Sequence, residues 1–445
     1  MARLKKNSVV KTVLGESVTV LEKLGEGGQG IVYKVQWHGD NYALKWYAKG
    51  VGKNADAFYK NLKNNVEKGA PAPTFLWPLA ITEIDSDGCF GYVMKLRPKE
   101  YKDFSQIIMN RAKFSGFKAV VNAALLMTVS FKLLHNKGLS YQDLNDGNFF
   151  INPVDGDVLI CDNDNVAPDG ENLGILGKPG YMAPEVVAMK HMPDASSDRF
   201  SLAVILFMLF FRNHPLAGMR DNDGDDPDAN VKRLYCTNSI FIFDPKDTSN
   251  RPKPGIHINA PKFWPVFPPF IQELFVKAFD KSLMTPDGAN REDRIIEKEW
   301  LKQLVRLRES IVTCPYCNSD TFYGLKSPQR TCMNCGQIVK RPPVLNIKDR
   351  LIPLQPGSCL YRYEVDSLTD YSVEIIKEPI GTVVQNKIHA NVTGLRNDSD
   401  FTWYRHTPGG IEQVFEKGKV LPIAPDNTIK FGTFCEGKIE MLETK

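Results

Sequence analysis

Apolar and polar residues alternate through much of the first hundred residues, a spacing typical of β-strands with one buried face. The alternation surrounds a glycine-rich stretch, GEGGQG at residues 25–30, and returns in NYALKWY at residues 41–47. One helical pattern interrupts it, in which Phe58, Leu62 and Val66 recur every four residues. The pattern therefore predicts a small β-rich unit that contains one helix.

The spacing of apolar residues becomes helical from Phe117 onward. Residues 117–138 carry an apolar stripe and end at Gly138, a residue type common just after a helix. The longest apolar run, residues 200–211, is shorter than the ~20 residues that span a bilayer, so we expect a buried helix there. The chain thus predicts a larger helical lobe after the β-rich one, with residues 95–104 as connector and a ligand cleft between the lobes.

The last third of the chain has a different pattern. Four cysteines occur as CPYC and CMNC between residues 314 and 335. Two prolines at residues 340–350 indicate a linker, and short alternating runs separated by Gly, Pro, Asn and Asp predict an all-β sandwich beyond it.

Composition narrows the class of partner and the compartment. The chain has 445 residues, 42% of them hydrophobic, and its net charge of +4 is the small difference between 56 basic and 52 acidic residues. This near balance of charge gives no reason to expect electrostatic binding to nucleic acid or to a membrane surface. The N-terminus lacks the apolar core of a signal peptide, so we expect a cytoplasmic protein without a disulfide framework.

Five features follow one another in a fixed order. The glycine turn runs into a strand, and Lys45 lies on the next strand, where an ammonium group could pair with phosphate oxygens held under the turn. Asp143 and Asn148 follow the helix that ends at Gly138, Asp162 follows the apolar strand VLIC, and Glu185 ends the sequence GKPGYMAPE. Each residue alone reads equally well as a loop cap or a strand-edge charge. Their common order favours one phosphate-binding site.

This series resembles the eukaryotic-like protein kinase family over roughly residues 15–308. The resemblance implies a mixed α+β, bilobal kinase domain at residues 1–308, with an N-lobe at about 1–95 and a C-lobe at about 96–308. It also implies a set of ATP-binding residues, among which Met94 corresponds to the gatekeeper, Leu96 to the hinge, and Ala43 and Phe150 to the surfaces around adenine. The full set is Gly25, Glu26, Gly27, Gly28, Gly30, Val32, Ala43, Lys45, Glu67, Met94, Leu96 and Phe150.

The same resemblance assigns roles around the phosphates. Asn148 and Asp162 would supply oxygen ligands to Mg²⁺, and Asp143 would accept or orient the proton of the attacking hydroxyl. Structural roles fall to Glu185 and Asp198, and Arg294 stands where the family has an arginine that pairs with the glutamate.

Several positions depart from the family pattern. Gln142 replaces the arginine that normally receives an activation-loop phosphate, and no serine or threonine lies between Asp162 and Glu185. We therefore expect activity without phosphorylation of Ser or Thr in that segment. Asp162 is followed by Asn163 and Asp164, and Asp164 is the alternative metal ligand.

Two positions also differ from the family pattern in charge: position 145 lacks the usual lysine, and position 178 carries one. Asn145 stands where Ser/Thr kinases usually carry a lysine, and Lys178 is either its substitute in catalysis or an ordinary surface lysine. Glu67 is the sole acidic residue between Asp56 and Glu83, so it is the candidate partner of Lys45 on the helix.

The C-terminal segments resemble two small modules. Cys314, Cys317, Cys332 and Cys335 resemble the knuckles of a zinc ribbon at residues 309–340, with a structural Zn²⁺, while a redox CxxC pair is the rival reading. After a linker at 341–350, residues 351–445 resemble a forkhead-associated (FHA) β-sandwich. The candidate phosphothreonine ligands are Arg396, Asn397 and Ser399; the alternative is a degenerate sandwich that binds no phosphate.

The combined prediction is a bacterial, ATP- and Mg²⁺-dependent Ser/Thr protein kinase with protein substrates. Its arrangement resembles kinases of tellurium-resistance-type systems, which implies von Willebrand A and PP2C phosphatase partners. The rival from another class is a nucleotide-binding pseudokinase scaffold that docks partners through the zinc ribbon and the FHA-like tail. Phosphorylation of a small molecule is disfavoured, because Glu185 and Arg294 look suited to a lobe that binds protein substrates.

Overall fold

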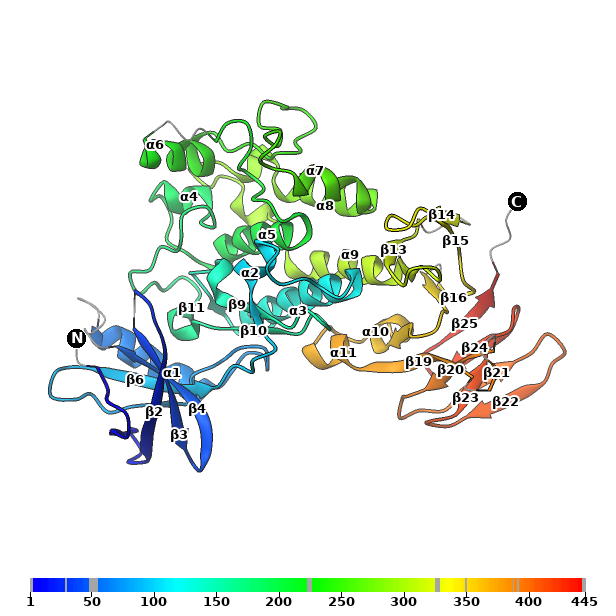
Figure 1. Cartoon of the computed structure of the whole chain (residues 1–445), viewed down its shortest axis with the longest axis horizontal. Helices are drawn as coiled ribbons and strands as arrows, with labels where there is room; N and C mark the ends of the chain where they lie inside the picture. The colour runs from blue at the N-terminus through cyan, green and yellow to red at the C-terminus, as the bar shows by residue number, and fades with distance from the viewer. Residues whose placement is uncertain are drawn as a thin grey trace.

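The N-terminal part of the chain forms a curled antiparallel sheet with one helix against it (Figure 1). The computed structural model describes residues 3–28, 30–47, 55–221, 226–324, 329–348, 350–386, 388–389 and 392–441. The sheet has the order β1-β2-β3-β4-β6-β5. Its elements are β1 (Val9–Lys11), β2 (Ser17–Glu26), β3 (Ile31–Trp37), β4 (Asp40–Tyr47), α1 (Ala55–Lys68), β5 (Ala80–Ile81) and β6 (Phe90–Lys95).

The alternation along β4 separates two apolar clusters. Leu44 and Trp46 pack into a cluster on one face of the sheet. Ala43 and Tyr47 belong to a second cluster on the other face, which includes Phe58 of α1. Because successive side chains of a strand point to opposite faces, Lys45 lies on the same face as Ala43 and Tyr47.

The helical lobe is built around the long apolar helix α3 (Phe117–Asn136), which packs against α5 (Ala195–Phe211) and α9 (Glu297–Glu309). By length and composition α3 could cross a membrane, yet 78% of its most apolar window is buried inside the protein, where it forms the core of the lobe. The other helices are α2 (Phe104–Ile108), α4 (Pro184–Val187), α5 (Ala195–Phe211), α6 (Pro227–Lys232), α7 (Asn259–Phe263), α8 (Pro269–Ala278) and α9 (Glu297–Glu309).

Short strands carry the loops that face the N-terminal sheet. One small sheet has the order β10-β9-β7, and β11 pairs with β8 in another. Their bounds are β7 (Lys102–Asp103), β8 (Leu139–Ser140), β9 (Phe149–Ile151), β10 (Val158–Ile160) and β11 (Ala167–Pro168).

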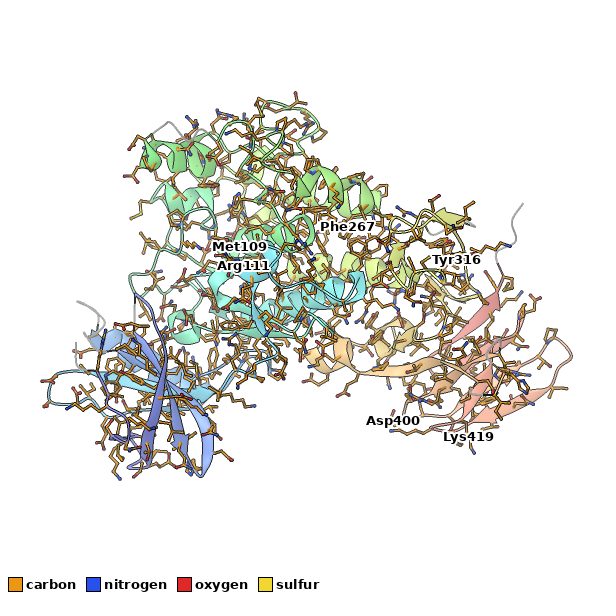
Figure 2. The ribbon with its side chains drawn as sticks, in the orientation of Figure 1. Met109, Arg111, Phe267, Tyr316, Asp400 and Lys419 are labelled. Carbon is orange, nitrogen blue, oxygen red and sulfur yellow. The ribbon has the colours of Figure 1, made fainter. Side chains whose placement is uncertain are left out.

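Two small hairpins follow α9 and hold the four cysteines. They are β12 (Ile311–Thr313) with β13 (Asp320–Phe322), and β14 (Gln329–Thr331) with β15 (Ile338–Lys340). Phe322 is buried against Phe117 of α3 and Phe267, which is labelled inside the helical lobe, while Tyr316 lies at the outer surface of the first hairpin (Figure 2). Asp320 Oδ2 accepts a hydrogen bond from the backbone nitrogen of Lys118 at 3.0 Å, so the first hairpin supplies the N-terminal cap of α3.

The C-terminal strands form two sheets at the far end of the molecule (Figure 1). Their orders are β17-β16-β25-β24-β21-β22 and β18-β19-β20-β23, and residues of both sheets share one core around Trp403. The strands are β16 (Val344–Ile347), β17 (Arg350–Pro353), β18 (Cys359–Tyr361), β19 (Pro379–Gln385), β20 (Thr393–Asn397), β21 (Trp403–His406), β22 (Glu412–Phe415), β23 (Val420–Pro422), β24 (Thr428–Phe431) and β25 (Cys435–Glu440).

Two predictions for this part are wrong. The segment 341–350 is not a free linker, because residues 344–347 form β16, which pairs with both β17 and β25. The tail is also not purely β, because it contains the short helices α10 (Arg362–Val365) and α11 (Val373–Lys377), and α11 packs against α3 of the helical lobe.

Candidate active site

The glycine turn joins β2 to β3 and leaves space above it. Gly27 N donates to Gly30 O at 2.9 Å, which closes the turn. A Cβ at Gly25, Gly27 or Gly28 would meet no atom within 4 Å, whereas a Cβ at Gly30 would lie 2.7 Å from Trp46 O. Glycine is therefore required at Gly30 by the adjacent strand, and the other glycines leave room for a ligand against the backbone.

Glu26 lies in the same turn but is held on the outside of the sheet. Its carboxylate accepts hydrogen bonds from Arg3 and Lys23, with Nζ of Lys23 at 2.5 Å from Oε2. The hydrogen bond from Lys23 is the main cause that lowers the pKa of Glu26. The carboxylate of Glu26 is therefore engaged by two basic side chains and is not free for a ligand.

The side chains predicted to surround adenine gather in one apolar cluster. Ala43 and Met94 are buried there, and Val32, Leu96 and Phe150 pack against them at the cluster's edge. These five residues come from β3, β4, β6, the connector and β9, so the cluster bridges the two lobes. The guanidinium carbon of Arg97 lies 4.0 Å from the centroid of the Phe150 ring, a cation–π contact that the sequence did not indicate.

Lys45 reaches from the sheet to the loop that follows β10. Its Nζ lies 3.3 Å from Asp162 Oδ1 and 2.8 Å from Asp164 Oδ2. Burial lowers the pKa of Lys45, but the charges of Asp164 and Asp162 outweigh burial, and the net effect raises the pKa. The ammonium group is therefore charged and held at the boundary between the lobes.

Asp162 is the more accessible of the two carboxylates. Its backbone has φ +53°, in the left-handed region, and 42% of its side chain is exposed, whereas the side chain of Asp164 is completely buried. Burial raises the pKa of Asp162, and Lys45 opposes that shift. Its exposure makes Asp162, rather than the enclosed Asp164, the carboxylate that a metal ion could reach.

The predicted pairing of Lys45 with Glu67 is wrong. Glu67 is exposed in the last turn of α1, and the buried polar residues of that helix are Asn61 and Asn65. Both asparagines donate to Val166 O at 2.8 Å, so α1 holds the segment after Asp164 through neutral amides. The sequence offers Asp164 as an alternative metal ligand, whereas in the structure Asp164 is the buried partner of Lys45.

Asp143 lies at the start of a tight loop that fixes its direction. Asn145 Nδ2 donates to Asp143 Oδ1 at 3.1 Å, and Asn148 Nδ2 donates to Asp143 O at 2.7 Å. The pKa of Asp143 is raised to about 6, mainly by burial; the hydrogen bond from Asn145 opposes this shift, and the charges of Asp162 and Asp164 add to it. A carboxylate with this pKa is ionised at neutral pH and still basic enough to accept a proton.

Helix α5 anchors this loop from below through Asp198. The carboxylate accepts hydrogen bonds from the backbone N–H groups of Tyr141 at 2.5 Å and Gln142 at 3.0 Å, and lies 3.2 Å from His135 Nε2.

Glu185 and Arg294 form a buried bidentate pair with both N–O distances at 2.7 Å. Three residues predicted as structural are thus buried and bonded within the helical lobe.

Lys178 does not contact Asp143. Its ammonium pairs with Asp146 Oδ1 at 2.6 Å and lies 5.2 Å from the ring centroid of Tyr181, with 53% of the side chain exposed. The residue before it, Gly177, has φ +99° and lies beside Asp143, since a Cβ there would be 3.8 Å from Asp143 Oδ1. In this structure the charge of Lys178 is therefore balanced by Asp146 at the rim of the site.

Gln142 holds the segment between Asp162 and Glu185, a role that the sequence did not reveal. Its amide nitrogen donates to Ser140 Oγ at 3.0 Å and to the backbone oxygen of Glu171, and its Oε1 accepts from Asn172 Nδ2 at 2.9 Å. Gln142 has φ +73° and is 4% exposed. A neutral amide thus orders the segment by direct contacts.

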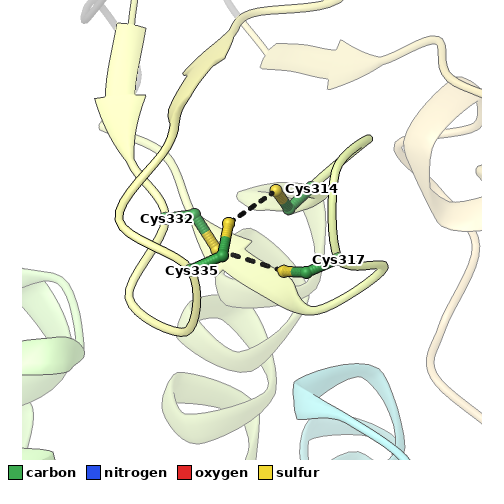
Figure 3. A group of neighbouring side chains, drawn as sticks. All are labelled: Cys314, Cys317, Cys332 and Cys335. Atoms are coloured by element: carbon green, nitrogen blue, oxygen red, sulfur yellow. Dashed lines mark hydrogen bonds between the residues drawn. The ribbon is translucent and has the colours of Figure 1, made fainter.

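The four cysteines of the two hairpins meet at one point (Figure 3). Their sulfur atoms all lie within 4.8 Å of one another; Cys314 Sγ is 3.7 Å from Cys335 Sγ, and Cys317 Sγ is 3.6 Å from Cys332 Sγ. A disulfide needs about 2.05 Å, whereas tetrahedral Zn–S bonds of about 2.3 Å place sulfurs about 3.8 Å apart. The donor set and its spacing therefore fit Zn²⁺.

The candidate phosphothreonine ligands are bonded within the C-terminal sheets. Asn397 Nδ2 donates to Phe401 O and Phe415 O, both at 2.9 Å, and Ser399 Oγ donates to Asn397 Oδ1 at 2.6 Å. Arg396 Nε pairs with Asp398 at 2.5 Å. These three residues therefore stabilise a turn and offer no free set of donors to a phosphate.

Comparison with known proteins agrees with this geometry. Residues 90–269 match the family model described as protein kinase domain. Serine/threonine-protein kinase ULK3 of Xenopus laevis is 28% identical over 217 residues, which cover 45% of this chain and 43% of that protein. Serine/threonine-protein kinase MPS1 of Saccharomyces cerevisiae is 25% identical over 294 residues, which cover 60% of this chain and 37% of that protein.

Among solved structures, the Mycobacterium tuberculosis PknI kinase domain aligns with 68% of this chain and 98% of its own, at 19% identity and a TM-score of 0.44. The chain spans less than half the length of the curated relatives that it matches. Residues 90–269 thus match a protein kinase domain, and the chain is similar in sequence to serine/threonine protein kinases.

Proposed function

We propose that the chain is an ATP-dependent protein kinase that transfers the γ-phosphate to serine or threonine hydroxyls of protein substrates. The observation that carries the proposal is the meeting of the lobes at Lys45, whose ammonium comes from β4 and lies 3.3 Å from Asp162 of the helical lobe. A cation, an exposed carboxylate and a glycine turn with open space above it suit a bound triphosphate.

The residues of this chain would divide the chemistry as follows. The apolar cluster around Ala43 and Phe150 would receive the adenine ring, and Lys45 would pair with phosphate oxygens. Asn148 and Asp162 would hold Mg²⁺, which when bound neutralises and orients phosphate oxygens. Asp143, oriented by Asn145, would accept the proton of the attacking hydroxyl at its carboxylate.

We further propose that the segment between Asp162 and Glu185 needs no phosphate on Ser or Thr. The contacts of Gln142 with Glu171 and Asn172 support this, because they replace an arginine–phosphate pair by direct hydrogen bonds. The segment's hydroxyl residue, Tyr181, is 6% exposed, which leaves little access for modification. Phosphosite mapping of the active protein that found a required phosphate in this segment would refute the proposal.

A pseudokinase scaffold is the second candidate. It is favoured by two observations: Asn145 carries no charge, and Lys178 is engaged by Asp146. Such a protein would bind ATP without transferring phosphate, and partners would dock on the cysteine hairpins and the C-terminal sheets.

One assay separates the two functions. The full chain is incubated with labelled ATP and Mg²⁺, with itself and with von Willebrand A and PP2C proteins as candidate substrates. We expect transfer that falls by about 10²- to 10⁴-fold in Asp143→Asn, because the general base is lost. Asp155→Asn, in an exposed turn, is the matched control and should transfer at the wild-type rate. ATP binding without transfer in the wild type would establish the scaffold instead.

A further inference from the structure

The buried lysine of the cleft needs a fixed partner, and helix α1 does not provide one. The acidic residues of α1, Asp56 and Glu67, are both exposed. Asn61 and Asn65 occupy its buried polar positions and donate to Val166 O. Within the described part of this helix, no carboxylate therefore faces Lys45.

Asp164 takes that place from the opposite side. It lies in a single 3₁₀ turn, Asn163–Asn165, and its side chain is completely buried. Its Oδ2 accepts from Lys45 Nζ at 2.8 Å and from the hydroxyl of Tyr47. Lys45 and Tyr47 are two residues apart on β4, so the strand presents both donors on one face to a single carboxylate.

The two carboxylates after β10 thus have different surroundings. Asp164 is enclosed and bonded to two donors of the sheet, and Asp162, two residues earlier, is 42% exposed and touches the same ammonium at 3.3 Å. A buried charge that loses its partner is costly, so Lys45 would turn to the nearest remaining anion. Removal of the Asp164 charge would therefore draw Asp162 onto Lys45 and away from a metal ion.

We propose that Asp164 is the positioning residue that fixes the ammonium group of Lys45 for the nucleotide phosphates and leaves the exposed side of Asp162 accessible to the metal. The proposal rests on the proposed use of this cleft for MgATP. It also implies that one short segment, Asp162 to Asp164, fixes the positions of both the lysine ammonium and the metal ligand. Helix α1 contacts the chain just after this segment through the hydrogen bonds from Asn61 and Asn65 to Val166 O. Movement of α1 would then not be required to form the ion pair.

The test measures binding of a non-hydrolysable ATP analogue to the full chain by calorimetry, at several Mg²⁺ concentrations. We expect Asp164→Asn to weaken binding at least tenfold and to raise the Mg²⁺ concentration needed for half-saturation. Asp162→Asn should instead remove the dependence on Mg²⁺. Glu67→Gln is the matched control, because it neutralises the helix carboxylate, and it should bind within twofold of the wild type.

A merely structural role for Asp164 gives a different result. In that case Asp164→Asn would lower the melting temperature while the folded protein kept the wild-type affinity and Mg²⁺ dependence, and the proposal would be overturned. It would equally be overturned if Asp164→Asn abolished the Mg²⁺ dependence and Asp162→Asn preserved it, since Asp164 would then be the metal ligand.

A second variant keeps the test decisive if Asp164→Asn fails to fold. Tyr47→Phe removes one of the two donors to Asp164 and retains the ring and the ion pair. We expect two- to fivefold weaker binding, and an unchanged affinity would contradict the proposal. Because binding is read without catalysis, a wild type that binds the analogue and transfers no phosphate would refute only the proposed function. A wild type that binds no nucleotide would refute both.

Discussion

The buried pair of Arg294 and Glu185 gives the sharpest test of how the helical lobe is held together. Both N–O distances are 2.7 Å, and the side chains are 3% and 0% exposed. Arg294 also donates to Ser196 O at 3.2 Å and to Leu283 O at 3.1 Å. The pair therefore links Glu185, in α4, to the loop that precedes α9.

The perturbation is Arg294→Met, which keeps much of the side-chain volume and removes the charge. Glu185 would remain as a buried carboxylate without its bidentate partner, and loss of one member of such a pair costs about 3–5 kcal/mol. The assay is urea unfolding followed by tryptophan fluorescence, from which the free energy of unfolding of the helical lobe is obtained. We expect this free energy to fall by that amount.

Two further variants control the reasoning. Lys277→Met breaks an exposed pair with Glu299 and should cost less than about 1 kcal/mol, because solvent already screens that pair. The double variant Glu185→Gln with Arg294→Met should be more stable than Arg294→Met alone, since no unpaired buried charge remains. A loss below about 1 kcal/mol for Arg294→Met, or a double variant in which the two losses simply add, would refute the argument.

Three other predictions concern stability, metal and ligand. Burial lowers the pKa of His135, but hydrogen bonds to Asp198 and Glu297 outweigh burial and raise it to about 9. Protonated His135 should therefore stabilise the folded state by on the order of 3 kcal/mol below the unfolded pKa near 6.5, and this stabilisation should disappear as the pH rises towards 9. The free energy of unfolding in urea should then differ between pH 6 and pH 9 in the wild type, but not in His135→Asn. Cys332→Ser should abolish stoichiometric zinc, measured by metal analysis, and leave the first hairpin sensitive to proteolysis, whereas full zinc content would contradict the site. Gly30→Ala should weaken nucleotide binding, because its Cβ would lie 2.7 Å from Trp46 O and displace the turn; an unchanged affinity would contradict that reasoning.

The sequence predicted the parts of the site that depend on order along the chain. Lys45 and Asp162 are 117 residues apart, yet the common order of the motifs and their resemblance to protein kinases implied one shared site, and the structure puts the two side chains 3.3 Å apart. The two CxxC pairs likewise predicted four converging thiolates, because each pair forms its own turn.

The sequence did not predict which of two nearby carboxylates would turn inward. Asp162 and Asp164 are both acidic and lie two residues apart, and their different exposure depends on contacts with Lys45 and Tyr47 of a distant strand, which the local sequence does not show. The sequence favours Glu67 as the partner of Lys45, because Glu67 is the sole acidic residue between Asp56 and Glu83. Its position in the last turn of α1 takes it away from the cleft.

The linker prediction failed for a similar reason. The prolines before Val344 indicate a break in regular structure, but β16 is stabilised by β25, which lies more than ninety residues later in the chain. Local patterns contain no signal for such a distant pairing. Helices α10 and α11 have four and five residues, too few for a helical period to be recognised.

The most direct test of the whole account is a crystal structure of the full chain with Mg²⁺ and a non-hydrolysable ATP analogue. The account predicts a metal ion on Asn148 and Asp162, phosphates beneath the glycine turn, and Lys45 in contact with a phosphate oxygen while Asp164 still holds its ammonium group. A nucleotide bound elsewhere, or a cleft that stays empty at saturating analogue with Lys45 bonded only to the two carboxylates, would contradict it.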